Sequence, residues 1–184
     1  MTRGLVLVAD GVDDVQFGYA FHRLREDAVL VDVAAPDGGP VTTGAGAALD
    51  ATGVADLPSN RRYDLAVVPG GDGSAELAAD DVIRRLVSAH VDAGGVVGAL
   101  AEGVGVLLAF GVLDGRLVAA PADLDDALAA GGARPSGEAV TVDGPFVTAR
   151  DADGLPYAIA ATLSSVSIPQ DAAAEARERA FWQS

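Results

Sequence analysis

Short apolar runs separated by segments of helical periodicity are the strongest constraint on the fold of this chain. The four clearest runs occupy residues 4–9, 29–34, 65–68 and 96–100. Helical patterns lie between or after them, at residues 15–25, 75–93 and 104–110. Strands that are apolar on both faces are typical of a parallel sheet covered on both sides. The alternation therefore predicts an α/β fold: a three-layer sandwich of a mostly parallel sheet between helices.

The second half of the chain continues the pattern with shorter elements. Strands are expected at 118–120, 140–142 and 146–149, with helices at 123–130 and 157–165. A length of 184 residues suits a single domain with one core. We expect this domain to span residues 1–165 and to be followed by a helical tail over 166–184. Phe181 and Trp182 in that tail are expected to dock on the domain or on a second subunit.

Composition excludes several classes of function. The formal net charge of −15 argues against nucleic-acid binding, which needs Lys and Arg to neutralise phosphates. The chain has no cysteine, so disulfides, thiolate metal sites and cysteine nucleophiles are all excluded. His22 and His90 lie far apart in the pattern, and no cluster of ligand residues predicts a metal site. No apolar run is long enough for a signal peptide or a membrane span, which favours a cytoplasmic protein.

The corner after the run at 96–100 is the most informative position. The sequence VVGALAEGVG places Ala101, Glu102 and Gly103 between a buried strand and a short apolar helix. In α/β enzymes such a corner often holds a nucleophile. Here it offers an alanine and a glutamate instead, and alanine cannot act as a nucleophile.

The ordered series of motifs resembles the PfpI superfamily, the class I glutamine-amidotransferase-like group that includes the parkinsonism-associated deglycase. The resemblance covers about residues 4–163. It rests on ADGVDDVQ (9–16), YDLAVVPGG (63–71), GGVVGALAEGVGVLLAFGVLDGR (94–116) and VDGPFVTAR (142–150). It implies a flavodoxin-like sandwich, usually a homodimer, with its site at the carboxyl ends of the strands.

At each of the family's three catalytic positions, this chain has a different residue. The family's cysteine corresponds to Ala101 and the histidine after it to Glu102, while Gly103 is kept. The family's glutamate on the first loop corresponds to Gln16. The cysteine-dependent deglycase, peptidase and amidotransferase reactions are therefore excluded.

Three polar residues could still carry chemistry at this place. Glu102 is expected at a helix N-terminus, where the macrodipole favours a carboxylate; it is either an ordinary first-turn residue or an acid–base group. Gln16 and Glu102 look like a compensated exchange that leaves a hydrogen-bonded pair. Asp13 either caps the following helix or faces the pocket as an acid–base group.

Backbone donors complete the candidate site. A group of backbone amides resembles the family's oxyanion hole and would bind a carbonyl or carboxylate oxygen. These are the amides of Gly70 and Gly71 and those at the corner, Ala101, Glu102 and Gly103. Arg150, after the last strand, is expected to anchor a loop.

Two hypotheses follow from these residues. In the first, the chain binds a small molecule and is a cofactor-free lyase, hydratase or isomerase that uses Glu102, Gln16 and Asp13. In the second, it is a catalytically inactive protein that acts as a binding or regulatory partner. Neither involves a metal or a cofactor. Both include a homodimer formed through residues 15–25, with Phe17 and Phe21, and through the tail.

Overall fold

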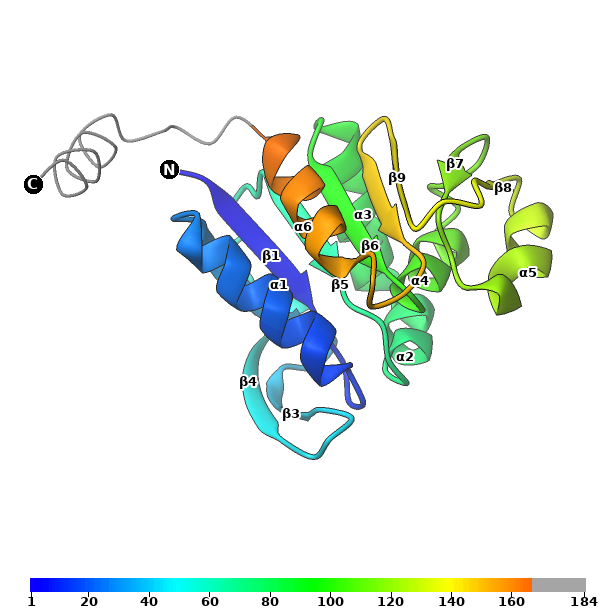
Figure 1. Ribbon diagram of the computed structural model, residues 1–184. Helices are drawn as coiled ribbons and strands as arrows, with labels where there is room; N and C mark the ends of the chain where they lie inside the picture. Colours follow the sequence, from blue (N-terminus) through cyan, green and yellow to red (C-terminus); the bar gives the residue numbers. More distant parts are fainter. Residues whose placement is uncertain (167–184) are drawn as a thin grey trace, which may run out of the picture.

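An eight-stranded, mostly parallel sheet forms the centre of the molecule in the computed structural model, which describes residues 1–166 (Figure 1). Its strand order is β3-β4-β2-β1-β5-β6-β10-β9. These strands are β1 (Arg3–Leu7), β2 (Leu30–Ala35), β3 (Gly39–Thr42), β4 (Ala48–Gly53), β5 (Leu65–Val68), β6 (Val96–Leu100), β9 (Val140–Asp143) and β10 (Phe146–Ala149). Only the outer pairs β3–β4 and β9–β10 are antiparallel.

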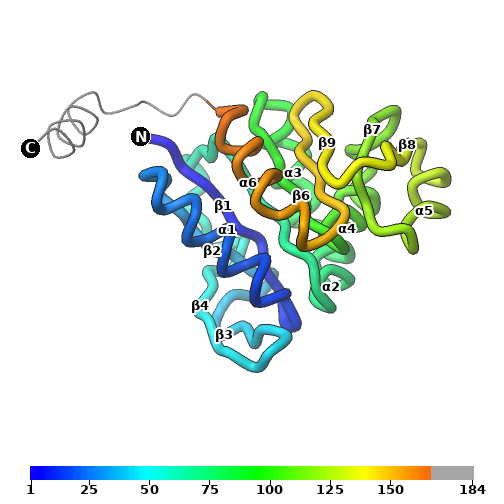
Figure 2. Tube along the Cα trace, viewed as in Figure 1, coloured from blue at the N-terminus to red at the C-terminus, as the bar shows by residue number. Residues whose placement is uncertain are grey.

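Helices cover both faces of this sheet. The described helices are α1 (Asp14–Glu26), α2 (Ser74–Ala79), α3 (Asp81–Asp92), α4 (Gly103–Ala109), α5 (Asp125–Ala130) and α6 (Leu155–Ser164), and α5 lies to the side of the sheet, next to β8. Figures 1 and 2 show α1 and α6 on one face, with α2, α3 and α4 on the other. Two short 3₁₀ turns lie at Val54–Asp56 and Ala122–Leu124. The predicted flavodoxin-like sandwich is confirmed.

Alternating side chains of the central strands supply two separate cores. In β5, Leu65 and Val67 pack toward α1 and α6, whereas Ala66 and Val68 pack toward α2, α3 and α4. All four residues are buried. A strand between two helical layers must be apolar at every position, which is why the short runs in the sequence located the sheet correctly.

Three elements differ from the sequence-based expectation. The helix predicted over 75–93 is two helices, because the carboxylate of Asp80 accepts from the amides of Val82 and Ile83 and begins a new helix there. The hairpin β3–β4 falls in residues 39–53, for which the sequence predicted no strand. The strand expected at 118–120 is β7 (Leu117–Val118), which pairs with β8 (Arg134–Pro135) outside the main sheet.

The tail predicted over 166–184 lies, apart from Val166, outside the described residues, as do Phe181 and Trp182. Within residues 1–166, none of the helices is long and apolar enough to cross a membrane.

Candidate functional site

Three loops meet at the carboxyl ends of β1, β5 and β6, the edge where open α/β sheets bind ligands. They are the segment before α1 (residues 8–13), the turn after β5 (69–71) and the corner between β6 and α4 (101–102). Backbone hydrogen bonds tie the first two together: the amide of Asp13 donates to the carbonyl of Gly70 at 2.9 Å, and Val12 forms a bridge with Gly71. The sequence-predicted site residues from these loops therefore lie in one region.

The corner has the sharp geometry of a strand-to-helix turn. Ala101 follows β6 directly and has a φ of +47°, a left-handed conformation that costs a residue with a Cβ roughly 1–2 kcal/mol. At Gly103 a Cβ would lie 2.3 Å from the carbonyl oxygen of Val68, so α4 can begin this close to β5 only with glycine there. The chain thus keeps a strained corner although the residue in it is only 6% exposed and chemically inert.

Glu102 turns its carboxylate back over the neighbouring turn. Its Oε2 accepts a hydrogen bond from the Gly71 amide at 3.0 Å. Gly70 makes room for this contact, because a Cβ at that position would lie 2.2 Å from the same oxygen. Glu102 is exposed to solvent, and no second hydrogen bond of its carboxylate occurs within residues 1–166. One oxygen of Glu102 is therefore engaged and the other is available.

Gln16 is buried and binds the adjacent amide. Its Oε1 accepts from the amide of Gly70 at 2.8 Å, and the residue is 6% exposed. The expected hydrogen bond between Gln16 and Glu102 does not form in the described structure. Each side chain accepts from its own glycine amide instead, so the two are neighbours across the turn without being partners.

Asp13 caps α1. Its Oδ1 accepts from the Gln16 amide at 2.8 Å, which is the usual hydrogen bond of an N-cap aspartate. This is the first of the two roles that the sequence left open for Asp13. The cap also fixes the first turn of α1, and with it the direction of the Gln16 side chain.

Asp14 joins the same loop to the β3–β4 hairpin. Its carboxylate accepts from the Thr43 hydroxyl and, at 2.7 Å, from the Ala45 amide. The Thr43 hydroxyl, followed by the Ala45 amide, holds the pKa of Asp14 below its ordinary value. Sequence reasoning missed this contact because it predicted no hairpin there; the Thr-Thr-Gly-Ala-Gly run at 42–46 was the available turn signal.

The backbone donors of the predicted oxyanion site are mostly engaged. Gly70 and Gly71 donate to Gln16 and Glu102, and Ala101 donates to the carbonyl of Ala149 at 2.9 Å. The amides of Glu102 and Gly103 have no acceptor within the described part of the chain. A ligand oxygen can thus reach the Gly71 amide only by replacing the Glu102 carboxylate.

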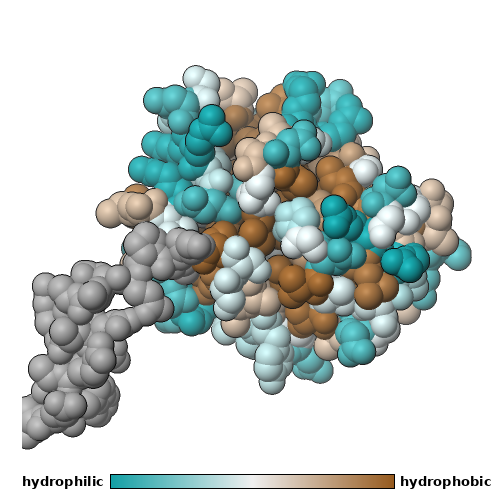
Figure 3. Space-filling model, turned by 90° about the horizontal axis from the view of Figure 1, so that it is seen from above, coloured by the Kyte–Doolittle hydropathy of each residue, from teal (hydrophilic) through white to brown (hydrophobic). Residues whose placement is uncertain are grey.

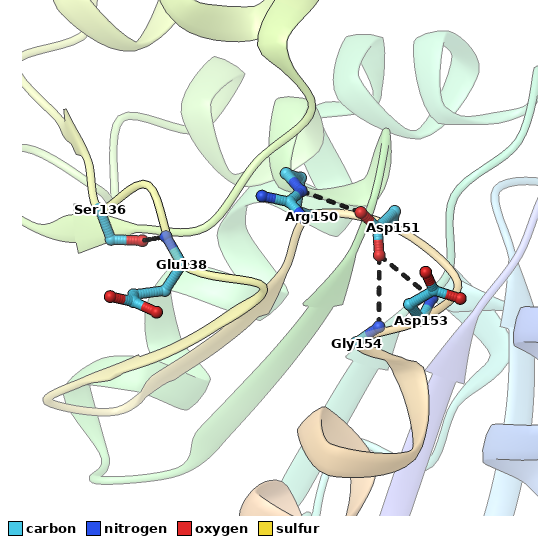
Figure 4. A network of polar contacts seen from close by, with 6 residues as sticks. All are labelled: Ser136, Glu138, Arg150, Asp151, Asp153 and Gly154. Carbon is cyan, nitrogen blue, oxygen red and sulfur yellow. Dashed lines mark hydrogen bonds and ion pairs between the residues drawn. The ribbon is translucent and has the colours of Figure 1, made fainter.

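The remaining polar candidates make other contacts. Arg150 binds Asp151 through Nε at 2.9 Å, and Asp151 in turn accepts from the amides of Asp153 and Gly154, so this group shapes the loop before α6 (Figure 4). His22 is exposed on α1, and Nε2 of His90 hydrogen-bonds the Val96 carbonyl at 3.0 Å. Among the described residues, no group of three or more acidic or histidine side chains could hold a metal ion.

Comparisons with known proteins agree with this architecture. Residues 2–164 match the model of the DJ-1/PfpI family. The chain is 27% identical to the deglycase TK1284 of Thermococcus kodakarensis over 146 residues, which cover 79% of this chain and 88% of that protein.

Two solved structures show the same fold. Drosophila melanogaster DJ-1beta superposes with a TM-score of 0.82 at 23% identity, covering 90% of each chain. A two-domain protein of Anabaena variabilis, with dj-1/thij/pfpi-like and ferritin-like domains, gives a TM-score of 0.84 at 23% identity. That match covers 89% of this chain but only 48% of the larger protein.

Proposed function

The chain belongs to the DJ-1/PfpI family, and from that premise we propose that it is a small-molecule-binding member which does not use thiol chemistry. In this proposal the corner binds a carbonyl or carboxylate oxygen of the ligand at the Gly71 amide. The Glu102 carboxylate holds that amide until the ligand replaces it.

The observation that carries the proposal is the 3.0 Å hydrogen bond between Gly71 N and Glu102 Oε2. A backbone amide that donates to one carboxylate oxygen is sterically and electrostatically suited to donate to another. Glu102 lies at the surface, so its side chain can rotate away without disturbing the core. Gln16 and Asp13 act as positioning residues here, since they fix the Gly70 amide and the first turn of α1.

The relatives' activity does not transfer with the fold. Related proteins are named deglycases, whereas this chain has Ala101 at the corner and no cysteine anywhere. The ligand is therefore expected to bind without forming a thiol adduct.

A titration of the Gly71 amide with acetate tests the proposal. We would follow the ¹H–¹⁵N signal of Gly71 in the wild type, Glu102→Gln and Glu102→Ala. The Ala variant leaves the amide open, so acetate should bind it at least tenfold more tightly than the wild type. Glu102→Gln keeps a neutral acceptor and should fall between them. Equal affinity in all three, or no acetate-induced shift at Gly71 in Glu102→Ala, would contradict the exchange.

A second candidate function is acid–base catalysis of the lyase, hydratase or isomerase type, with Glu102 as the proton-transfer group. One observation favours it: the second carboxylate oxygen of Glu102 has no hydrogen bond within residues 1–166 and lies at the solvent-exposed corner. A ligand that takes the Gly71 amide would release the whole carboxylate beside itself. General acid–base assistance contributes about 10²–10⁴-fold.

Hydrogen–deuterium exchange at the methyl group of pyruvate is a direct probe of this second function. The wild type should accelerate exchange in D₂O, and Glu102→Gln should return it to the buffer rate while the melting temperature stays nearly constant. Equal rates for wild type and variant would leave only the binding function.

We also propose that the chain forms a homodimer through α1. Val15, at the start of α1, is 65% exposed, and Tyr157, at the start of α6, is 72% exposed. The two helices pack against each other. Phe17 and Phe21 stack along α1 with their ring centroids 5.6 Å apart. Exposed apolar side chains on adjacent helices favour pairing with a second surface.

A further inference from the structure

A groove of about 1110 Å³ lies at the end of the sheet opposite the corner, where the parallel strands begin. Its walls come from η1 (Val54–Asp56) and the segment between it and β5, from α3 and the turn before β6, and from Ser165 and Val166 just after α6. We call it the amino-end groove. Figure 3 views the molecule from the top of Figure 1, where β1 begins and α6 ends, and shows hydrophobic patches separated by hydrophilic groups.

The charge of the groove is opposite to that of the protein. The whole chain carries a formal net charge of −15, yet the groove is lined by Arg61, Arg62 and Arg85 against the single carboxylate of Asp64. Because only twelve basic residues serve the whole sequence, three in one groove are a marked local concentration.

Two of these arginines have no ion-pair partner among the described residues. Arg61 pairs with Asp32 at 2.8 Å, and Asp64 accepts from the backbone amide of Arg3 at 2.8 Å. Arg62 and Arg85 are exposed and form no ion pair within residues 1–166. Their charges are therefore available to an anion that enters the groove.

The groove also offers apolar and aromatic surface. Leu57, Val82, Leu86 and Val96 line it together with Tyr63 and His90. Burial, with help from Asp32, raises the pKa of Tyr63 to about 12, and burial lowers the pKa of His90. Both side chains are thus neutral near pH 7, so they add contact surface without charge. A concave surface with converging polar groups and perturbed titratable residues is typical of a ligand site.

We propose that the amino-end groove binds an anionic small molecule with an apolar body, whose carboxylate, sulfonate or phosphate group is held by Arg62 and Arg85. The apolar body packs on the aliphatic side chains of α3 and of the segment before β5. This site is independent of the corner and of Glu102, so it stands whether or not the corner binds a ligand.

Paired probes that differ only in charge test the proposal on the 184-residue chain. We would titrate 2-naphthoate and 2-naphthamide into ¹⁵N-labelled protein and follow the amides of Gly94 and Gly95, which line the groove. The anion should produce saturable shifts at both amides and should bind more tightly than the neutral amide. Equal binding of the two probes, or shifts confined to other residues, would overturn the proposal.

Two double variants separate the groove from general electrostatics. Arg62→Gln with Arg85→Gln should weaken naphthoate binding at least tenfold, because it removes both charged donors. The control is Arg25→Gln with Arg134→Gln, which removes the same charge from exposed arginines outside the groove. These two arginines also form no ion pair within residues 1–166. The control should change the affinity for naphthoate less than twofold. Equal losses in both double variants would overturn the proposal. Unchanged melting temperatures verify that all four substitutions leave the fold intact.

Discussion

The carboxylate of Glu102 accepts a hydrogen bond from the backbone amide of Gly71 at 3.0 Å, across the turn that follows β5. The Glu102 side chain therefore occupies the Gly71 amide, which the family resemblance assigned to a ligand oxygen. The corner therefore keeps its backbone geometry while Ala101 contributes no chemistry. How the Gly71 amide is shared between Glu102 and a ligand is the question on which the function depends.

Gly70→Ala should disrupt this contact without touching Glu102. A Cβ at position 70 would lie 2.2 Å from Glu102 Oε2 and 3.0 Å from both Glu102 N and Leu100 O. We expect the carboxylate to leave the Gly71 amide, so that acetate binds as it does to Glu102→Ala. Gly18→Ala is the matched control, because nothing lies within 4 Å of its added Cβ. In the middle of α1 it should stabilise the protein by about 0.5–1 kcal/mol and leave acetate binding unchanged. A Gly70→Ala variant with wild-type acetate affinity would contradict the steric argument.

His90 should make stability depend on pH below about 7. Burial lowers the pKa of His90 below its ordinary value near 6.5, so the folded protein binds fewer protons than the unfolded chain in this range. The free energy of unfolding should therefore fall as pH decreases from 7 toward the lowered pKa. Urea denaturation at half-unit pH steps measures the slope. His90→Gln should flatten it. The same slope in His90→Gln would refute the assignment.

The deglycase activity named for the relatives should be absent. The chain cannot form a thiolate because it has no cysteine, and Ala101 occupies the corner. Turnover in a deglycase assay should equal that of buffer. Pretreatment with iodoacetamide is the control, since it inactivates contaminating cysteine enzymes and cannot modify a thiol in this chain. Iodoacetamide-resistant turnover comparable to that of a cysteine-bearing relative would show that the activity does not need the thiol.

Sedimentation equilibrium at micromolar concentration should give twice the chain mass of 18.4 kDa. Val15→Asp should raise the dimer dissociation constant at least tenfold, because it places a charge in an apolar contact. Val142→Asp is the matched control: Val142 is 54% exposed and lies on β9, at the edge of the sheet away from α1. A monomer at all concentrations, or equal effects of both variants, would rule out an interface through α1.

The central sheet could be predicted because each of its inner strands is buried on both faces. Leu65–Val68 and Val96–Leu100 have the predicted bounds, since an apolar run between turn residues leaves little choice of ends. The β3–β4 hairpin could not be predicted in this way. Most of its side chains are exposed or half-buried, so its sequence has no apolar run that indicates a strand.

The contacts of the candidate site were harder to predict than its location. The sequence placed Gln16, Gly70, Gly71 and Glu102 at one edge of the sheet, because strand ends determine that edge. It suggested a Gln16–Glu102 pair, whereas each side chain accepts from a glycine amide. That choice depends on approaches of about 3 Å between residues more than 30 positions apart in the chain. The amino-end groove was missed for a similar reason, since its walls come from segments that are far apart in the chain.

A pH titration that follows the Gly71 amide proton and the Glu102 side-chain carboxyl carbon together by NMR tests the central claim most directly. If the Glu102 carboxylate occupies the Gly71 amide, protonation weakens the acceptor. Both signals should then move with one midpoint, and the Gly71 transition should vanish in Glu102→Gln. A constant chemical shift of the Gly71 amide proton, while that of the Glu102 carboxyl carbon changes with pH, would contradict the account.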